Sequence, residues 1–305
     1  MAPASSQRSI RVAIQGEKGS FSEAAARRLL APDGLELLCC SSFADVFTAL
    51  RRGTADTAVI PIENTLAGSV AANYDLLRRE AVTIVAETNL RIRHQLITPP
   101  GVSLRAIRRV LSHPVALDQC RRFLRRHPRW EAVPFYDTAG SVQYIVEQGL
   151  RDAAAIAGVP AAKAYGARVV AANIEDNPRN FTRFLRLLPA AAAAKAAVAA
   201  NPSRRRHPTH KVSVVFATRN QPGALCRCLN VFALRGIDLS RIESRPTPGR
   251  PWEYSFYLDF FGALSQPTVR QALSDLAAVS DELKILGSYP AVRKEPPRGR
   301  ARLGH

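Results

Sequence analysis

Short apolar runs alternate with stretches of helical periodicity along the first part of the chain. Residues 10–14 are apolar enough for a buried strand, and residues 21–30 place alanines on one face of a helix. A glycine turn at 15–20 joins the two. The same alternation continues with a predicted strand at 35–40, a helix at 43–52 and a strand at 57–61. The pattern predicts an α/β unit.

A second α/β pattern begins near Thr83. Residues 82–87 and 93–97 look extended, and we expect the first of them to cross between two lobes. A strand that ends in a polar turn is predicted at 111–114, and further strands at 133–136 and 153–157. Helices are predicted at 116–125, 142–148 and 159–165, before the chain returns through 169–173. We therefore expect two lobes with helices on both sheet faces, and a cleft that can close on a ligand.

The C-terminal third has a different composition. Residues 189–210 are alanine-rich, then rich in proline, arginine and histidine, and lack an apolar stripe, which predicts a linker. Residues 211–288 show a βαββαβ order, which predicts a ferredoxin-like domain. We predict a disordered N-terminus at 1–9, the two-lobed domain at 10–188 and a basic, disordered tail at 289–305.

Composition narrows the class of protein. Of 305 residues 47% are hydrophobic, which fits a globular chain with real cores. No run of eighteen apolar residues is present, and residues 1–9 lack the apolar centre of a signal peptide, so we expect a cytoplasmic protein with no membrane partner. The net charge of +18 suggests nucleic acid, but its basic runs carry no interleaved aromatics. We expect no nucleic-acid partner, and a field that attracts an anionic substrate.

Cysteine and histidine give no sign of a metal or a disulfide framework. The five cysteines are an odd number with no paired C-x-x-C units, and the six histidines show no metal-ligand spacing. We expect reduced thiols and no metal.

Polar side chains gather at the predicted strand ends. The loop 62–70 follows a buried strand, where open α/β sheets line a ligand crevice, and it carries a glutamate, an amide and hydroxyls. Helix capping by Asn64 or Ser69 is the alternative, but several converging polar groups favour a site. A second cluster, 180–184, places Thr182 and Arg183 between two phenylalanines.

Short motifs follow one another along most of the chain. They are Gly16, Gly19, Ser20, Phe21 and Ser22; Pro61, Ile62, Glu63, Asn64 and Thr65 with Gly68, Ser69 and Val70; His94, Gln95 and Leu96; Ser112, His113 and Pro114 with Gln119 and Cys120; Asp137, Thr138 and Ala139; and Asn180 with Thr182, Arg183 and Phe184. Taken in order, these motifs resemble those of prephenate dehydratase. Thr65 and Asp137 each stand where serine is more frequent in the family. Asp137 is similar to plant-type arogenate dehydratases, which leaves the substrate open.

The resemblance implies a two-lobed fold like type II periplasmic binding proteins, no cofactor, and decarboxylating dehydration of prephenate to phenylpyruvate in phenylalanine biosynthesis. Thr182 is expected to hydrogen-bond the departing hydroxyl. Glu63 supplies the proton or holds the Asn64 loop, and Arg183 pairs with a substrate carboxylate or with Glu175 or Asp176. The expected substrate-binding residues are Ser20, Asn64, Thr65, Ser69, Thr138, Asn180 and Phe184, of which the hydroxyl and amide residues could equally be caps or turn residues. His113 is interpreted as turn structure.

The predicted ferredoxin-like domain resembles the family's ACT regulatory domain. The residues that carry this resemblance are Gly223, Ala224, Leu225, Glu243, Ser244, Arg245 and Pro246. They imply an effector site for L-phenylalanine and a homodimer or homotetramer, although the motifs could serve dimer formation alone. No chorismate mutase-like segment is seen, so we expect a monofunctional enzyme. The alternatives are an arogenate dehydratase and a non-catalytic two-lobed binding module.

Overall fold

The computed structural model describes residues 9–30, 34–199, 209–218, 220–247 and 252–292. The chain divides into two compact units with the boundary between Ala199 and Ala200. The predictions made for residues 1–8, 200–208 and 293–305 lie outside the described residues. No helix of the described part is long and apolar enough to cross a membrane.

The first lobe of the N-terminal unit is built on a sheet with the strand order β5-β11-β3-β1-β2. Strands β1, β3 and β2 are parallel, whereas β11 runs antiparallel to both β3 and β5. Its strands are β1 (Ile10–Gln15), β2 (Leu35–Cys40), β3 (Thr57–Asn64), β4 (Gly68–Ser69), β5 (Val82–Arg91) and β11 (Phe181–Pro189), and its helices are α1 (Phe21–Leu29), α2 (Phe43–Arg52) and α3 (Ala71–Arg79).

Local sequence signals fix where these helices begin and end. Ser42 and Asp45 form a reciprocal capping box at the start of α2, and Gly53 ends that helix in the left-handed conformation with φ 69°. Helix α1 packs its alanines against a core that includes Val12, Val59 and Phe184. The strand ends that carry the motif residues are therefore anchored on a packed sheet.

The second lobe has a five-stranded sheet with the order β10-β6-β9-β7-β8. All five residues of β9 are buried, and the small alanine side chains allow α6 to pack closely on the sheet. The strands are β6 (Gln95–Thr98), β7 (Arg109–Ser112), β8 (Glu131–Pro134), β9 (Ala153–Ala157) and β10 (Arg168–Ala171), and the helices are η1 (Leu104–Ala106), α4 (Pro114–Asp118), α5 (Arg121–Arg125), α6 (Thr138–Glu147) and α7 (Val159–Ala164).

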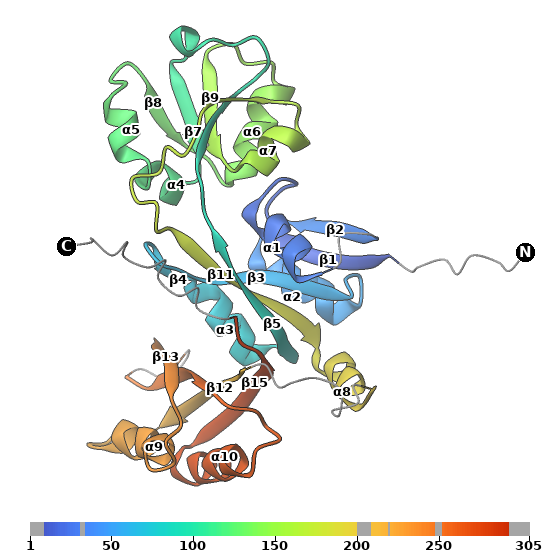
Figure 1. Ribbon diagram of the computed structural model, residues 1–305, viewed down its shortest axis with the longest axis vertical. Coiled ribbons are helices and arrows are strands. Elements are labelled where there is room, and N and C mark those ends of the chain that lie inside the picture. Colours follow the sequence, from blue (N-terminus) through green and yellow to red (C-terminus); the bar gives the residue numbers. More distant parts are fainter. Residues whose placement is uncertain (1–8, 31–33, 200–208, 219, 248–251, 293–305) are drawn as a thin grey trace, which may run out of the picture. The chain divides into compact units, whose positions relative to one another are not determined.

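Two adjacent chain segments join the lobes. Strands β5 and β11 lie side by side and lead from the first lobe toward the second (Figure 1). Beyond them, the Ile92 N–H donates to the Asn180 carbonyl oxygen at 2.8 Å. The two crossings are thus hydrogen-bonded to each other where they leave the first lobe, and the two separate sheets confirm the expected two-lobed α/β architecture.

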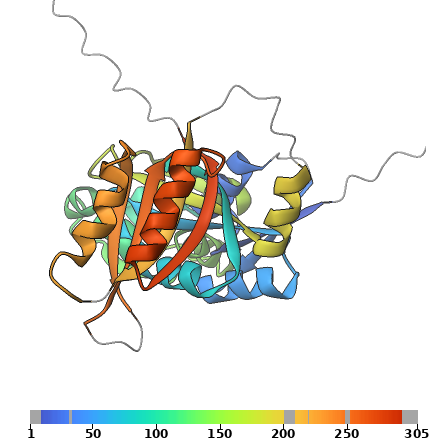
Figure 2. The ribbon, with the colours of Figure 1, turned by 90° about the horizontal axis from the view of Figure 1, so that it is seen from below.

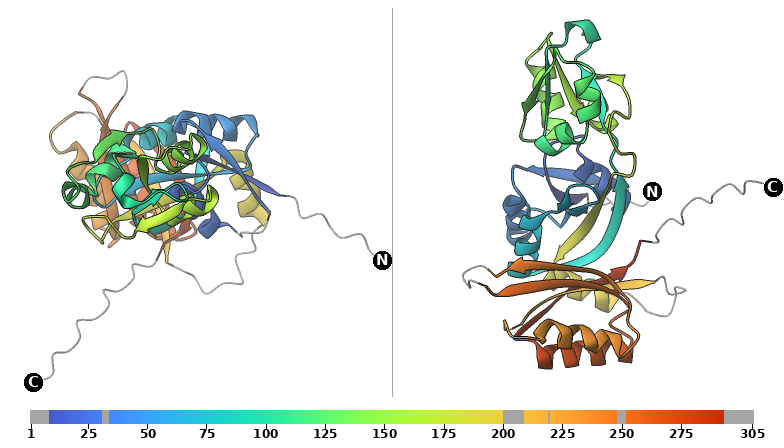
Figure 3. Two further views of the ribbon diagram at one scale, coloured as in Figure 1. Left: turned by 90° about the horizontal axis from the view of Figure 1, so that it is seen from above. Right: turned by 90° about the vertical axis from the view of Figure 1, so that its left-hand side faces the viewer.

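The C-terminal unit has the order βαββαβ of the predicted ferredoxin-like fold. Its elements are β12 (His210–Thr218), α9 (Ala224–Ala233), β13 (Leu239–Pro246), β14 (Tyr254–Phe261), α10 (Pro267–Val279) and β15 (Glu282–Pro290), with the strand order β13-β14-β12-β15. Figure 2 and Figure 3 show α9 and α10 on one face of this sheet. Phe216, Phe232 and Phe260 lie in the core between these helices and the strands.

Three local expectations differ from the structure. The helix predicted at 116–125 is two short helices, because the chain turns at Gln119 and Asp176 accepts the Arg122 N–H at 3.0 Å to start α5. Residues 190–199 of the predicted linker form a helix, α8, since alanine has the highest helix propensity. Tyr289, placed at the start of the tail, is a buried residue of β15.

Candidate active site

The hydroxyl of Thr182 lies at the start of β11 and is 8% exposed. Its Oγ accepts a hydrogen bond from Asn64 Nδ2 at 2.9 Å. The Asn64 amide is oriented because its Oδ1 accepts the backbone N–H groups of Leu66 and Ala67 at 3.0 and 2.8 Å. Thr182 is therefore an acceptor toward Asn64, and its own proton is left to donate toward the pocket. A hydroxyl that accepts a hydrogen bond is also a better donor.

Gln119 connects this hydroxyl to the second lobe. Its Oε1 accepts from Asn180 Nδ2 at 2.7 Å and contacts His94 Nε2 at 2.9 Å, and its Nε2 donates to Asn64 Oδ1 at 3.4 Å. Asn180, which is fully buried, accepts in turn from Asn64 Nδ2 at 2.7 Å. The amides hold one another in fixed orientations, so the site is preorganised by neutral hydrogen bonds.

His94 is neutral in this network. Since Gln119 Oε1 can only accept, His94 Nε2 carries the proton and Nδ1 holds a lone pair. Only 2% of His94 is exposed, and burial lowers the pKa of His94 below its ordinary value of 6.5. Nδ1 has no hydrogen-bond partner in the described part of the chain.

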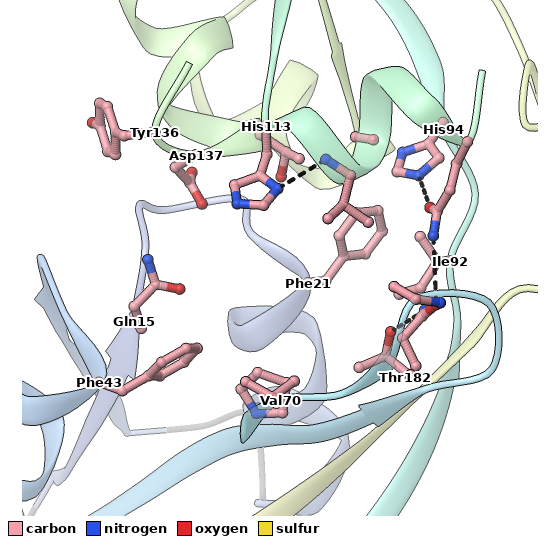
Figure 4. A pocket seen from close by; sticks show the side chains of 18 of the residues that line it. Gln15, Phe21, Phe43, Val70, Ile92, His94, His113, Tyr136, Asp137 and Thr182 are labelled. Atoms are coloured by element: carbon pink, nitrogen blue, oxygen red, sulfur yellow. Dashed lines mark hydrogen bonds between the residues drawn. The ribbon is translucent and has the colours of Figure 1, made fainter. Parts of the chain in front are cut away.

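These groups open on a pocket of about 590 Å³ between the two lobes (Figure 4). This size suits a small organic ligand. Of the described residues that line it, none is lysine or arginine, Asp137 is the one carboxylate, and His94 and His113 are the histidines. Gln15, Phe43 and Val70 face the pocket from the first lobe, and His113, Tyr136 and Asp137 face it from the second.

Backbone donors add to the pocket. No side chain caps α3 at Val70, which lines the pocket beside Ser69. The N–H groups in the first turn of a helix lack partners within the helix and favour an anion. The pocket therefore offers amides, hydroxyls and a helix N-terminus to carboxylates, in place of arginine.

Glu63 and Arg183 do not line the pocket. Glu63 of β3 pairs with Arg183 of β11, and Asn64 pairs with Thr182 at the neighbouring position. Because successive side chains of a strand point to opposite faces, Glu63 and Arg183 lie on the face away from Asn64 and Thr182. Arg183 binds Glu87, with Nε and one terminal nitrogen each 2.7 Å from Oε2. The expected pairings of Arg183 with a substrate carboxylate, Glu175 or Asp176 do not fit this geometry, nor does Glu63 as proton source.

The predicted substrate-binding residues separate into two groups. Asn64, Ser69 and Thr138 line the pocket together with Thr182. The other four do not: Ser20 caps α1 through the Glu23 N–H, Thr65 Oγ1 donates to Arg179 O and accepts the Phe181 N–H, Asn180 lies in the amide network, and Phe184 is in the core. Hydrogen bonds within the protein or packing in the core account for each of these four.

Several pocket residues were not predicted from the sequence. They are Gln15, Phe43, His94, Gln119, Tyr136 and Asp137. His94, Gln119 and Asp137 stand in the quoted motifs, so the motifs marked the right segments without giving roles. Burial and the nearby Glu17 carboxylate raise the pKa of Tyr136 to about 12.

The predicted effector residues lie in two places in the C-terminal unit. Gly223 has φ 76° and precedes α9 without a side-chain cap, Ala224 is buried and Leu225 packs on the core. Strand β13, at one end of the ladder, carries the other motif, with Ser244 and Pro246 exposed. Glu243 pairs with Arg241 at 3.2 Å.

Comparison with known proteins places the chain. The family model for prephenate dehydratase matches residues 12–191, and the ACT domain model matches residues 212–278. The chain belongs to the prephenate dehydratase family. This membership confirms the resemblance seen in the motifs, including the ACT domain.

Within the described residues, no group of three or more His, Cys, Asp or Glu side chains gathers as a metal would require.

Plant proteins are among its similar relatives. Arogenate dehydratase/prephenate dehydratase 2, chloroplastic, of Arabidopsis thaliana is 41% identical over 291 residues, covering 92% of this chain and 73% of the relative. Arogenate dehydratase 2 of Petunia hybrida is 40% identical over 297 residues, covering 92% and 72%.

Solved structures share the whole architecture. Prephenate dehydratase from Arthrobacter aurescens in complex with L-Phe is 32% identical with a TM-score of 0.81, covering 93% of this chain and 92% of that one. A chain described as GqqA, a novel type of quorum quenching acylase, is also 32% identical with a TM-score of 0.80, covering 92% and 98%. Because such different descriptions accompany one fold, the activity has to be argued from the pocket.

Proposed function

We propose that the protein is a carbon–oxygen lyase that catalyses the decarboxylating dehydration of prephenate or its amino-acid form, arogenate. The observation that carries the proposal is the Thr182 hydroxyl, held as an acceptor by Asn64 and left to donate into a pocket between two lobes. Membership of the family and the plant relatives named for both substrates support it.

The reaction can be balanced without a covalent intermediate. The ring carboxylate of prephenate leaves as CO2, its electron pair moves through the cyclohexadiene, and the ring hydroxyl departs with its bonding electrons. Prephenate dianion and one proton give phenylpyruvate, CO2 and water. The ring becomes aromatic, which supplies the driving force. The enzyme must orient the carboxylates and stabilise the departing oxygen.

Thr182 performs the second task as a hydrogen-bond donor. Its proton points at the leaving hydroxyl, and the negative charge that grows on that oxygen strengthens the bond in the transition state. Amides cannot pass a proton along, so the network of Asn64 and Gln119 positions Thr182 rather than feeding it. The proton that completes the water then comes from solvent.

The two substrate carboxylates are bound by neutral donors. We place one at Ser69, beside Val70 at the start of α3, and the other at Thr138, because Ser69, Val70 and Thr138 line the pocket and the two hydroxyls can donate. The apolar ring lies against Phe21 and Phe43, which line the same pocket.

Regulation and assembly are part of the proposal. L-phenylalanine is the proposed effector, bound at Gly223 and the Glu243–Pro246 segment, because a structurally similar prephenate dehydratase is described in complex with L-Phe. The helix start at Gly223, with φ 76° and no side-chain cap, suits a carboxylate. We also propose a homo-oligomer in the cytoplasm.

Turnover assays test the activity. Purified protein is mixed with prephenate, phenylpyruvate is followed by its absorbance in alkali, and phenylalanine formed from arogenate is measured by amino-acid analysis, each with and without added L-phenylalanine. Thr182→Val, which removes the hydroxyl and keeps the shape, should lower kcat about 100-fold to 1,000-fold. Thr182→Ser keeps the hydroxyl and is the matched control. Full activity of Thr182→Val refutes the role of Thr182 as hydrogen-bond donor. If the wild type forms no product from either compound, the protein is a non-catalytic binding module.

A further inference from the structure

The Asp137 carboxylate is a charge in the pocket that the proposed chemistry leaves without a use. It is 9% exposed and lies at the start of α6, where its Oδ1 accepts the Gly140 N–H at 2.7 Å. The first lobe approaches it closely, since a methyl group on Gly16 would lie 2.7 Å from Asp137 Oδ2. Both lobes therefore meet at this carboxylate.

The described lining of the pocket holds neither lysine nor arginine that could face Asp137. His113 is the basic side chain that acts on this carboxylate, and its Nδ1 accepts the Val115 N–H at 3.3 Å. Burial raises the pKa of Asp137, and the backbone N–H groups of Gly140, Glu17 and Ala139 together with His113 lower it in part.

A ligand can supply the missing charge. Prephenate carries two carboxylates, a ring hydroxyl and a keto group, so it brings two negative charges, and its keto-acid side chain offers only hydrogen-bond acceptors. Arogenate replaces the keto group with a protonated amine, which has one positive charge and three N–H donors. An ammonium group beside a buried carboxylate forms a charge-assisted hydrogen bond, whereas a keto oxygen there meets a second acceptor.

We propose that Asp137 determines substrate preference, and that its carboxylate pairs with the α-ammonium group of arogenate and disfavours the keto acid prephenate. The inference rests on the proposed function of the pocket. It names the amino-acid form as the preferred substrate and assigns that preference to one side chain.

A helix cap alone does not require this residue. Serine and asparagine cap helices about as well as aspartate does, so the charge is not needed to start α6. Replacement by either should therefore preserve the fold and remove the charge. The substitutions separate capping from recognition.

The test compares kcat/KM for arogenate and prephenate in the wild type, Asp137→Ser and Asp137→Asn. We expect the wild type to prefer arogenate, and both variants to lower the arogenate-to-prephenate ratio at least about tenfold, equivalent to about 1.4 kcal/mol. The change should fall mainly on KM for arogenate. Thermal midpoints close to that of the wild type show that the cap is kept.

Glu17→Gln is the matched control. Glu17 also carries a carboxylate, and it accepts a hydrogen bond from Tyr136. Tyr136 lines the pocket, whereas Glu17 does not. The ratio for Glu17→Gln should change less than about twofold, because the pairing is direct. A shift as large as that of Asp137→Ser would overturn the direct pairing in favour of a general field, and an unchanged ratio in both Asp137 variants would leave Asp137 as a cap.

Binding separates this inference from the proposed activity. Calorimetric titration of Thr182→Val with each compound measures preference without turnover. If Thr182→Val binds arogenate more tightly than prephenate, and Thr182→Val/Asp137→Ser loses that preference, the pairing with Asp137 is supported. This holds even if the wild type turns over neither compound, although that lack of turnover would refute the proposed lyase activity. Equal binding of both compounds overturns the role of Asp137 even if the enzyme is active.

Discussion

Arg183 provides the sharpest test of how this site is built, because the sequence makes it a substrate ligand and the structure pairs it with Glu87. The two side chains are 13% and 2% exposed and contact each other at 2.7 Å on the strands β11 and β5. Arg183→Met keeps the length of the side chain and leaves the Glu87 carboxylate buried without its arginine. Breaking a buried pair in this way costs about 3–5 kcal/mol.

That cost is large against a total stability of about 5–15 kcal/mol. In a unit of this size each kcal/mol moves the melting temperature by about 2–4 °C, so Arg183→Met should melt about 6–20 °C below the wild type. Adding Glu87→Gln removes the stranded charge and should recover most of the loss. Turnover of the double variant, measured well below its midpoint, should also recover, since neither side chain lines the pocket.

The exposed pair Arg109–Asp152 is the matched control. Its charged atoms are 2.8 Å apart, close to the distance in the buried pair, but its side chains are 42% and 47% exposed. Arg109→Met should therefore cost no more than about 1 kcal/mol. The reasoning fails if Arg183→Met melts with the wild type, or if the folded double variant stays inactive, which would return Arg183 to the substrate.

Two further predictions follow from a buried histidine and a glycine. Burial lowers the pKa of His94 below 6.5. Below about pH 6.5 the unfolded chain therefore binds a proton at His94 more readily than the folded chain does, so the free energy of unfolding should fall as the pH drops. His94→Gln should flatten that fall in urea titrations from about pH 5 to about pH 7.5, and a variant as acid-sensitive as the wild type would contradict it. Gly19→Ala should lower the free energy of unfolding more than Gly53→Ala and should raise KM. A methyl group on Gly19 would lie 2.5 Å from the Ala161 backbone in the other lobe, whereas a methyl group on Gly53 meets nothing within 4 Å. Both glycines have positive φ, so Gly53→Ala measures the backbone cost alone, about 1–2 kcal/mol; equal losses would refute the contact.

The fold could be predicted from the sequence because its strands and helices have strong periodic patterns. Residues 153–157 and 58–60 are apolar throughout, and both runs are buried in strands. The lack of an apolar stripe predicts a linker for the alanine-rich segment after β11, but alanine favours a helix even without such a stripe, and residues 190–199 form α8. The break between α4 and α5 depends on Asp176, far along the chain, and no local pattern contains that information.

The candidate site was harder to predict, because a motif marks a segment and not the direction of each side chain. Ser20, Thr65 and Asn180 are hydroxyl and amide residues close to the pocket in sequence, yet their polar atoms cap a helix, join two backbone groups and hold Gln119. The sequence gives no sign of the role of Gln119, because that role comes from long-range partners in the other lobe and in the crossing segments. Such partners appear only after the chain has folded.

Strand alternation explains why this pocket works with neutral groups. On β11, Thr182 faces the pocket, and Arg183, the next residue, faces away from it. On β3 the same alternation separates Asn64 from Glu63. Glu63 and Arg183 therefore lie on the side of the sheet where Arg183 contacts Glu87. The Asn64 amide and the Thr182 hydroxyl lie on the side that faces the ligand. A one-residue slip of β11 would exchange these roles, bringing Arg183 into the pocket and burying Thr182 beside Glu87. The buried pair of Arg183 and Glu87 would be broken by that slip, so the pair also helps to keep Thr182 aimed at the ligand.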